Sequence, residues 1–248
     1  MLPISKEISD MKTHSTPKKS GFTLLETVIA IGVLAVLLTG FLAVFGPAAA
    51  GIRRAINVQE ADRLTSTLER ELVALREGQA GGTGFGKAYD WIKESHEAQN
   101  ALFVYQYRGD PSRQRSDGSL EPVAKLDGTP GTDFIVQPMC RRASDKYFYQ
   151  DLRGIEGGVF LVKCTQLTYT SGGAGMEAKT SNKGSITDPD GGAGGGTAET
   201  YTAAVIAFAA EFYSMPAKTP EFFQGNAFAT RFESFKNPMF VRNLAIRR

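Results

Sequence analysis

An apolar run from Phe22 to Phe45 constrains the fold of this chain more than any other feature. Leu, Val, Ile, Ala, Phe and Gly dominate the run, and Glu26 is its only ionisable side chain. At about 1.5 Å per residue, a helix of this length is roughly 36 Å long, enough to cross a hydrocarbon core of roughly 30 Å. We therefore predict one membrane-spanning helix over residues 22–46. Its carboxylate needs a partner, because a charge at the centre of such a helix costs roughly 2.5 to 3.5 kcal/mol.

The residues at the start of this run form a recognisable motif. The basic pair Lys18-Lys19 is followed by Ser20-Gly21, and the apolar run then opens with Phe-Thr-Leu-Leu-Glu. This string resembles the class III signal of type IV pilins and type II secretion pseudopilins. The resemblance implies that a prepilin peptidase removes residues 1–21 as a leader by cutting after Gly21, and then methylates the new amino terminus at Phe22. It also implies that Glu26 of a neighbouring subunit neutralises the amine of Phe22 during filament assembly.

Two other interpretations of the amino-terminal segment are weaker. An ordinary signal anchor with one stray glutamate would share the apolar run. A secretory signal peptide cut before Gly51 would use the small residues Ala48-Ala49-Ala50, but its apolar region normally has about 7 to 15 residues. Lys and Arg flank the run on both sides, so the leader motif decides the orientation. It places a single-pass protein in a bacterial inner membrane with its carboxy-terminal domain in the periplasm.

The helix is expected to continue beyond the membrane. Gly46-Pro47 predicts a bend or local melting, because proline lacks the N–H that a helix interior requires. Residues 47–78 then form an amphipathic continuation, since apolar residues recur every three to five positions on one face. Gly78 is placed to end the helix as a C-cap.

Residues 79–248 predict an exported α+β domain built on an antiparallel sheet of at least four strands. Strand-forming segments are expected at residues 101–107, 133–136, 158–169, 201–213 and 240–248, and residues 108–118 are expected to form a polar turn. Both faces of segment 201–213 are apolar, which indicates a central strand. The pilin-like fold that the resemblance implies lays the amphipathic half of the long helix across this sheet.

Residues 171–200 are rich in Gly, Ala, Ser and Thr, and we expect a mobile hairpin insertion there. Asp188-Pro189-Asp190-Gly191 offers oxygen ligands, but two aspartates are short of the six to eight ligands that calcium takes, so a turn is favoured. The two cysteines, Cys140 and Cys164, both fall in the exported part. An oxidising periplasm would join them if their Cβ atoms approach, and two buried free thiols are the alternative.

Composition argues against two classes of function. A net charge of +2 gives no indication of nucleic-acid binding by bulk charge. The chain has two histidines, of which His14 lies in the leader and His96 stands alone in the exported part. No Gly-x-Ser-x-Gly nucleophile motif occurs. We therefore expect neither an enzyme nor a cofactor or metal site.

The sequence thus predicts a minor pseudopilin, a structural subunit of a type II secretion filament. Its expected partners are the prepilin peptidase, other pilins or pseudopilins, an inner-membrane assembly platform and membrane lipid. Residues 22–248 are longer than a typical major pseudopilin of the family, and Glu26 argues against the extreme tip subunit, which lacks this charge. Two alternatives remain open: a minor type IV pilin for adhesion or DNA uptake, and a membrane-anchored periplasmic protein that does not polymerise.

Overall fold

The computed structural model describes residues 21–77, 82–124, 128–170, 173, 175–189, 196–224 and 226–248. The chain divides into two compact units, residues 1–51 and residues 52–248. Helix α1 (Leu24–Arg63) contains the boundary between them. Each unit is described by itself.

The described part of the first unit is helical from Leu24 onward. The helical stretch Leu24–Val73 has the length and composition of a membrane span, and the mean hydropathy of its most apolar window is 2.8. The backbone stays helical through Pro47, so the expected local melting there is wrong. Proline removes one hydrogen bond, and membrane helices tolerate that loss when neighbouring backbone groups adjust.

Helix α2 (Thr65–Val73) follows α1 after a one-residue break and ends earlier than the amphipathic pattern predicts. Lys87 is fully buried, and its Nζ donates hydrogen bonds to the carbonyls of Glu71 at 2.6 Å and Ala74 at 2.5 Å. A cation at the last carbonyls of a helix stabilises that end. Gly78, the expected C-cap, lies outside the described residues.

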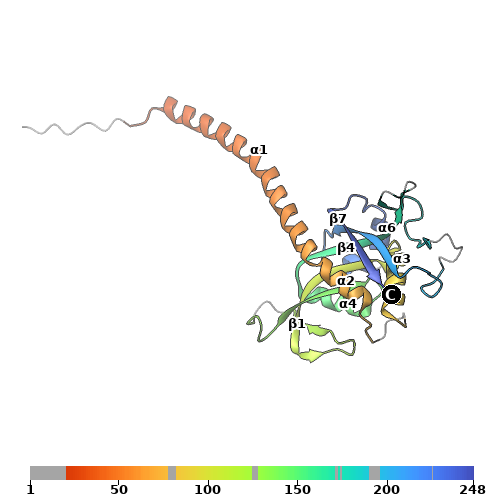
Figure 1. The fold of residues 1–248 in the computed structure, drawn as a ribbon. Coiled ribbons are helices and arrows are strands. Elements are labelled where there is room, and N and C mark those ends of the chain that lie inside the picture. Colours follow the sequence, from red (N-terminus) through yellow and green to blue (C-terminus); the bar gives the residue numbers. More distant parts are fainter. Residues whose placement is uncertain are drawn as a thin grey trace, which may run out of the picture. The chain divides into compact units, whose positions relative to one another are not determined.

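The second unit is built on a seven-stranded antiparallel sheet (Figure 1). The strand order is β2-β1-β4-β6-β7, with β3 also paired to β1 and β5 to β4. The strands are β1 (Leu102–Gln114), β2 (Leu120–Pro122), β3 (Ile135–Arg142), β4 (Ile155–Tyr169), β5 (Met176–Ala178), β6 (Val205–Ser214) and β7 (Phe240–Arg247). Strand β6 lies between β4 and β7, which confirms the prediction of a central strand. The polar segment 108–118 is not all turn, because β1 continues to Gln114 by pairing with β3 and β2.

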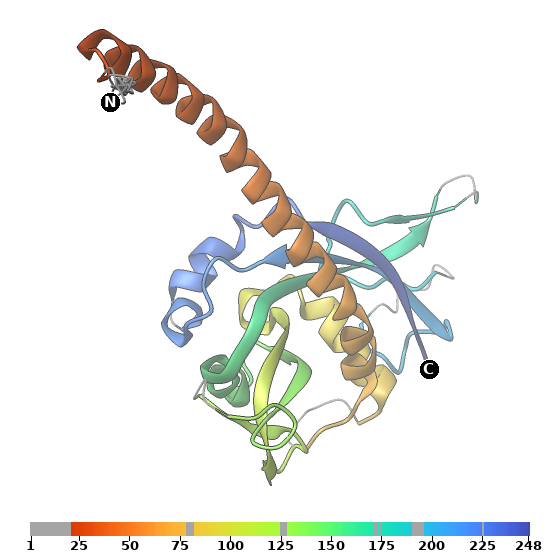
Figure 2. The same cartoon turned by 90° about the vertical axis from the view of Figure 1, so that its left-hand side faces the viewer.

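Helices cover both faces of the sheet (Figure 2). One face packs against α2 and α3 (Gly84–Glu94), and the other packs against α4 (Lys146–Asp151), α5 (Pro220–Phe223) and α6 (Asn226–Phe232). Short 3₁₀ turns occur at Ala98–Asn100 and Leu152–Gly154. The long amino-terminal helix and the antiparallel sheet together make the α+β arrangement that the sequence predicts. The second helical layer, which is rich in phenylalanine, was not foreseen.

The described part of the Gly-rich insertion is more ordered than its composition predicts. Strand β5 pairs with the end of β4, and Ile186 packs in the same core as α2 and α3. Gln166 of β4 bonds the backbone of Thr187 in both directions, at 2.7 and 2.8 Å. The described residues therefore contain the expected hairpin, made by β4 and β5, and Ile186 anchors the stretch that follows; the expected mobility stays a prediction. Residues 171, 172, 174 and 190–195 lie outside the described part.

Cys140 and Cys164 are both buried and free. Cys140 lies on β3 and Cys164 on β4, and these strands pair with opposite edges of β1. Neighbouring strands are about 4.8 Å apart, so strands separated by a third are about 10 Å apart. A disulfide needs Cα atoms within about 7 Å. The structure therefore contradicts the expected disulfide.

The last turns of α1 are attached to the sheet by polar contacts. The register of β4 against β1 shifts between Glu156 and Val159, and Gly157 at this bulge has a φ of +76°. Glu60 accepts a hydrogen bond of 2.7 Å from the backbone N–H of Gly158. A bulge leaves backbone groups without a strand partner, and here the carboxylate supplies the missing acceptor.

Candidate functional site

The predicted processing and assembly residues lie together at the start of α1. Thr23 precedes the first helical residue, and Glu26 is the third residue of the helix. The hydroxyl of Thr23 accepts from the N–H of Glu26 at 3.2 Å, while the Glu26 carboxylate accepts from the N–H of Thr23 at 2.9 Å and from its hydroxyl at 3.0 Å. This reciprocal pattern is a capping box, which satisfies backbone donors that a helix start otherwise leaves unpaired.

The side chains that follow this cap are exposed all round the helix. Phe22 is 86% exposed, and every large apolar side chain from Leu24 to Phe45 is more than half exposed. A helix that is apolar on every side belongs in lipid or among other helices. The structure therefore presents a capped helix with exposed apolar side chains, and Gly21 and Phe22, the predicted cleavage residues, are exposed beside it.

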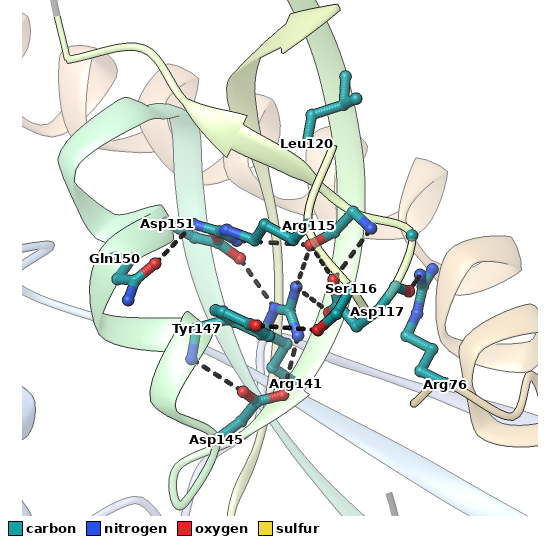
Figure 3. Close-up of polar contacts among 12 residues, drawn as sticks. Arg76, Arg115, Ser116, Asp117, Leu120, Arg141, Asp145, Tyr147, Gln150 and Asp151 are labelled. Carbon is teal, nitrogen blue, oxygen red and sulfur yellow. Dashed lines mark hydrogen bonds and ion pairs between the residues drawn. The ribbon is translucent and has the colours of Figure 1, made fainter. Parts of the chain in front are cut away.

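A second polar arrangement lies in the unit formed by residues 52–248 and centres on Arg141 of β3 (Figure 3). Arg141 is 1% exposed, and its guanidinium pairs with Asp151 at 2.9 Å, Asp145 at 2.8 Å and Asp117 at 2.9 Å. Arg115 pairs with the other oxygen of Asp151 at 2.6 Å. These contacts join β3 and α4, which follow one another in the chain, to the turn between β1 and β2, which lies about 20 to 30 residues earlier.

The electrostatics of this network follow from burial and pairing. Burial opposes the charge on Arg141, but its carboxylate neighbours and Tyr105 raise its pKa overall. Burial raises the pKa of Asp151. Its two arginine partners and the hydroxyl of Tyr105 lower that pKa, but the effect of burial is larger. For Asp117, burial acts in the same direction, but the hydroxyl of Ser119 and the charge of Arg141 lower the pKa overall. Every charge in the network has a partner, and such a set is structural in character.

The other polar candidates do not form a site. Among the described residues there is no group of three or more His, Cys, Asp or Glu side chains placed to hold a metal ion. Asp188 accepts from the N–H and the hydroxyl of Thr202, at 2.7 and 2.6 Å, and Asp190 lies outside the described residues. A ring nitrogen of His96 hydrogen bonds with the hydroxyl of Thr165 at 3.0 Å.

Comparison with known proteins gives one match. Residues 16–42 match the family described as the prokaryotic N-terminal methylation motif, which is the signal motif of type IV pilins and pseudopilins. A search of curated proteins and a search of solved structures found no match. The match covers the leader junction, the capping box and most of the apolar run. It supports a type IV pilin-like protein anchored in a membrane, and it implies processing by a prepilin peptidase and assembly with other pilins.

Sequence reasoning found Glu26 but missed its local partner. The pattern Thr23-x-x-Glu26 ahead of an apolar run is the sequence signature of a capping box, so this contact was readable. The network around Arg141 could not be predicted from the sequence, because its members come from segments whose proximity depends on the strand register. The motif's family is structural rather than enzymatic.

Proposed function

We propose that this chain is a minor pseudopilin, a structural subunit of a type II secretion filament. The observation that carries the proposal is the methylation motif at residues 16–42, placed at the start of an exposed, fully apolar helix. The α+β unit that follows has the antiparallel sheet expected of the exported part. The subunit acts mechanically, through packing of its amino-terminal helix into the filament.

The proposal assigns each part of the chain to a step in processing, membrane insertion or filament assembly. Residues 1–21 are the leader that prepilin peptidase removes in the cytoplasm, residues 22–46 span the inner membrane, residues 47–78 continue the helix, and residues 79–248 are the periplasmic unit. Before assembly the helix is stored in membrane lipid. An inner-membrane assembly platform then moves it into a filament with other pseudopilins.

Glu26 has a different partner at each stage of this proposal. In the isolated chain its carboxylate accepts from the N–H and hydroxyl of Thr23. After cleavage, the amine of Phe22 in a neighbouring subunit becomes available as a cationic partner. Removing one member of a buried charge pair costs about 3 to 5 kcal/mol, so the pairing selects a single axial register between subunits.

Substitution of Glu26 tests the proposal. A photo-crosslinking residue at the exposed position Val36 should form adducts with a second motif-bearing subunit in intact membranes. Glu26→Gln should lower the adduct yield at least about tenfold, because a neutral side chain cannot pair with the amine. Leader cleavage should remain, since Gly21 and Phe22 are unchanged.

The matched control is Thr23→Val, which removes the capping hydroxyl and keeps the negative charge. It should retain most of the adduct. Undiminished adducts from Glu26→Gln would contradict the assembly role and favour a non-polymerising anchor. Deletion of the gene separates the two filament systems: we expect loss of protein secretion, whereas loss of pili or DNA uptake with secretion intact would identify a minor type IV pilin.

A further inference from the structure

The exported unit contains a cavity of about 660 Å³ that the filament role does not use. Its walls come from α3, from the turn between β1 and β2, and from the turn between β3 and α4. Ligand sites in proteins typically have about 300 to 1,000 Å³. The cavity is therefore large enough for a short peptide segment.

The buried network around Arg141 (Figure 3) includes residues that line one side of this cavity. Asp117 and Asp145 line the cavity and are both fixed by Arg141. Asp145 also caps α4 by accepting from the N–H of Tyr147 at 2.9 Å, and the hydroxyls of Tyr147 and Ser116 lie 3.3 Å apart. A wall of this kind needs no rearrangement to receive a ligand, which lowers the entropic cost of binding.

The rest of the lining carries polar groups that the described chain leaves without partners. Glu77 and Asp90 make no hydrogen bond or ion pair with any other described residue. Trp91 is 4% exposed, yet its indole N–H donates to no acceptor in the described part of the chain. Arg142 pairs with Glu94 at 3.0 Å through one nitrogen, while its buried Nε and Nη2 have no hydrogen-bond acceptor in the described part of the chain. Buried donors normally have acceptors, so these two nitrogens of Arg142 point to a ligand that supplies them.

The charges of the lining indicate which ligand would fit. Of the five carboxylates that line the cavity, Asp117 and Asp145 pair with Arg141, and Glu94 pairs with Arg142. The carboxylates of Glu77 and Asp90 have no ion-pair partner among the described residues, so they attract a cation to their part of the cavity. The unpaired donors on Trp91 and Arg142 require acceptors such as peptide carbonyl oxygens. A peptide that carries a basic side chain offers both kinds of group at once.

We propose that this cavity binds a segment of a protein partner through an arginine or lysine side chain. The basic group pairs with Glu77 and Asp90, and carbonyl oxygens of the same segment accept hydrogen bonds from Trp91 and Arg142. This interaction is separate from helix packing in the filament. It gives the exported unit a recognition role of its own.

Trp91 makes the proposal directly measurable, because it is the only tryptophan in the chain. The full chain in detergent is titrated with acetyl-Gly-Arg-Gly-amide, and tryptophan fluorescence is excited at the red edge, where tyrosine does not absorb. The matched probe replaces arginine with citrulline, which keeps the shape and removes the charge. We expect a saturable change with the arginine peptide below about 10 mM, the range of a weak isolated contact, and little change with the citrulline peptide.

Variants assign the response to the cavity. Glu77→Gln combined with Asp90→Asn should weaken binding of the arginine peptide about tenfold, because two charge-assisted pairs are lost. Both side chains are at least partly exposed, so the double variant is expected to fold. Glu221→Gln, which neutralises an exposed acid outside the cavity lining, should leave the affinity unchanged.

Four results would overturn the proposal. No saturable change with the arginine peptide would remove the site, and so would an equal response to the citrulline peptide. Unchanged affinity in the Glu77→Gln and Asp90→Asn double variant would remove the assigned carboxylates. An equal response to agmatine, a guanidinium without peptide groups, would reassign the cavity to small-molecule cations. None of these results bears on whether the amino-terminal helix assembles into a filament.

Discussion

At the scale of single residues, the sequence predicts contacts between neighbours along the chain better than contacts between distant residues. The amino-terminal motif is an example of the first kind, and the two cysteines are an example of the second. The charge of Glu26 inside an apolar run predicts that it needs a partner, and the structure gives it Thr23, three positions away. Such local contacts follow from helix periodicity alone. The spacing of Cys140 and Cys164 carries no such information, because the position of β1 between their strands decides their distance.

The state of the two thiols is directly testable. In denaturant without reductant, an alkylating reagent should add two labels to the full chain, one on each cysteine, because the thiols are free. In native buffer near neutral pH, labelling should be far slower, since both side chains are buried and burial raises the pKa of each thiol. Mass spectrometry counts the labels. A chain that takes up no label in denaturant until it is reduced would contain the disulfide that the structure contradicts.

At the scale of elements, residue patterns predict the existence of strands better than their ends. Segment 201–213 has two apolar faces, and β6 is a central strand that buries one face fully and the other in part. Segment 108–114 is polar and contains proline and glycine, so it resembles a turn, yet pairing with β3 and β2 keeps it extended. The bulge in β4 and its contact with Glu60 could not be predicted, since they depend on a register that only the folded sheet defines.

Gly157→Ala tests the attachment of α1 to this bulge. At a φ of +76° an L-residue is strained, and a Cβ there would lie 1.8 Å from Oε1 of Glu60. The carboxylate must move and release the N–H of Gly158. We expect a loss of about 2 to 4 kcal/mol in the free energy of unfolding of the exported unit, from backbone strain and one charge-assisted hydrogen bond. Chemical denaturation followed by circular dichroism measures it.

Two further variants separate the contribution of backbone strain from that of the hydrogen bond between Glu60 and Gly158. Gly131 has a φ of +87° and open space around it, so Gly131→Ala should cost only the strain, about 1 to 2 kcal/mol. Glu60→Ala should remove the same hydrogen bond as Gly157→Ala, so the double variant should be less destabilised than the sum of the two single changes. Strict additivity would show that Glu60 does not act through the bulge.

At the scale of the whole molecule, the sequence is informative about the first unit and much less so about the second. The motif and apolar run together predict a membrane anchor and a processing pathway, because both depend on local residues. The two-sided core of the second unit depends on long-range packing. Helices α4, α5 and α6 are four to seven residues long, too short for periodicity to identify them.

The two buried thiols should lower the stability of the unit formed by residues 52–248 as the solution becomes alkaline. Burial raises the pKa of Cys164 to about 12, from an ordinary value near 9, and raises that of Cys140 further. Between these values the unfolded chain loses protons that the folded chain keeps, so the free energy of unfolding decreases as pH rises. Each thiol contributes at most about 1.4 kcal/mol per pH unit.

Urea denaturation measures how the free energy of unfolding changes with pH. The range from about pH 8 to about pH 10 contains the ordinary thiol pKa. The control replaces both cysteines with alanine. The slope of the variant should be less negative than that of the natural chain. Buried Tyr105 and Tyr107, whose pKa values burial raises, make the remaining slope more negative, and Lys87, whose pKa burial lowers to about 8, makes it more positive. Equal slopes in the two chains would contradict the burial of the thiols.

The central claim, that this chain enters a pilin-type assembly pathway, depends on how its amino terminus is processed. The most direct measurement is the mass of the amino-terminal peptide from membranes of cells with and without prepilin peptidase. The account predicts a chain that begins at methylated Phe22 only when the peptidase is present. A chain that begins at Gly51, or one that stays uncut in both strains, would contradict it.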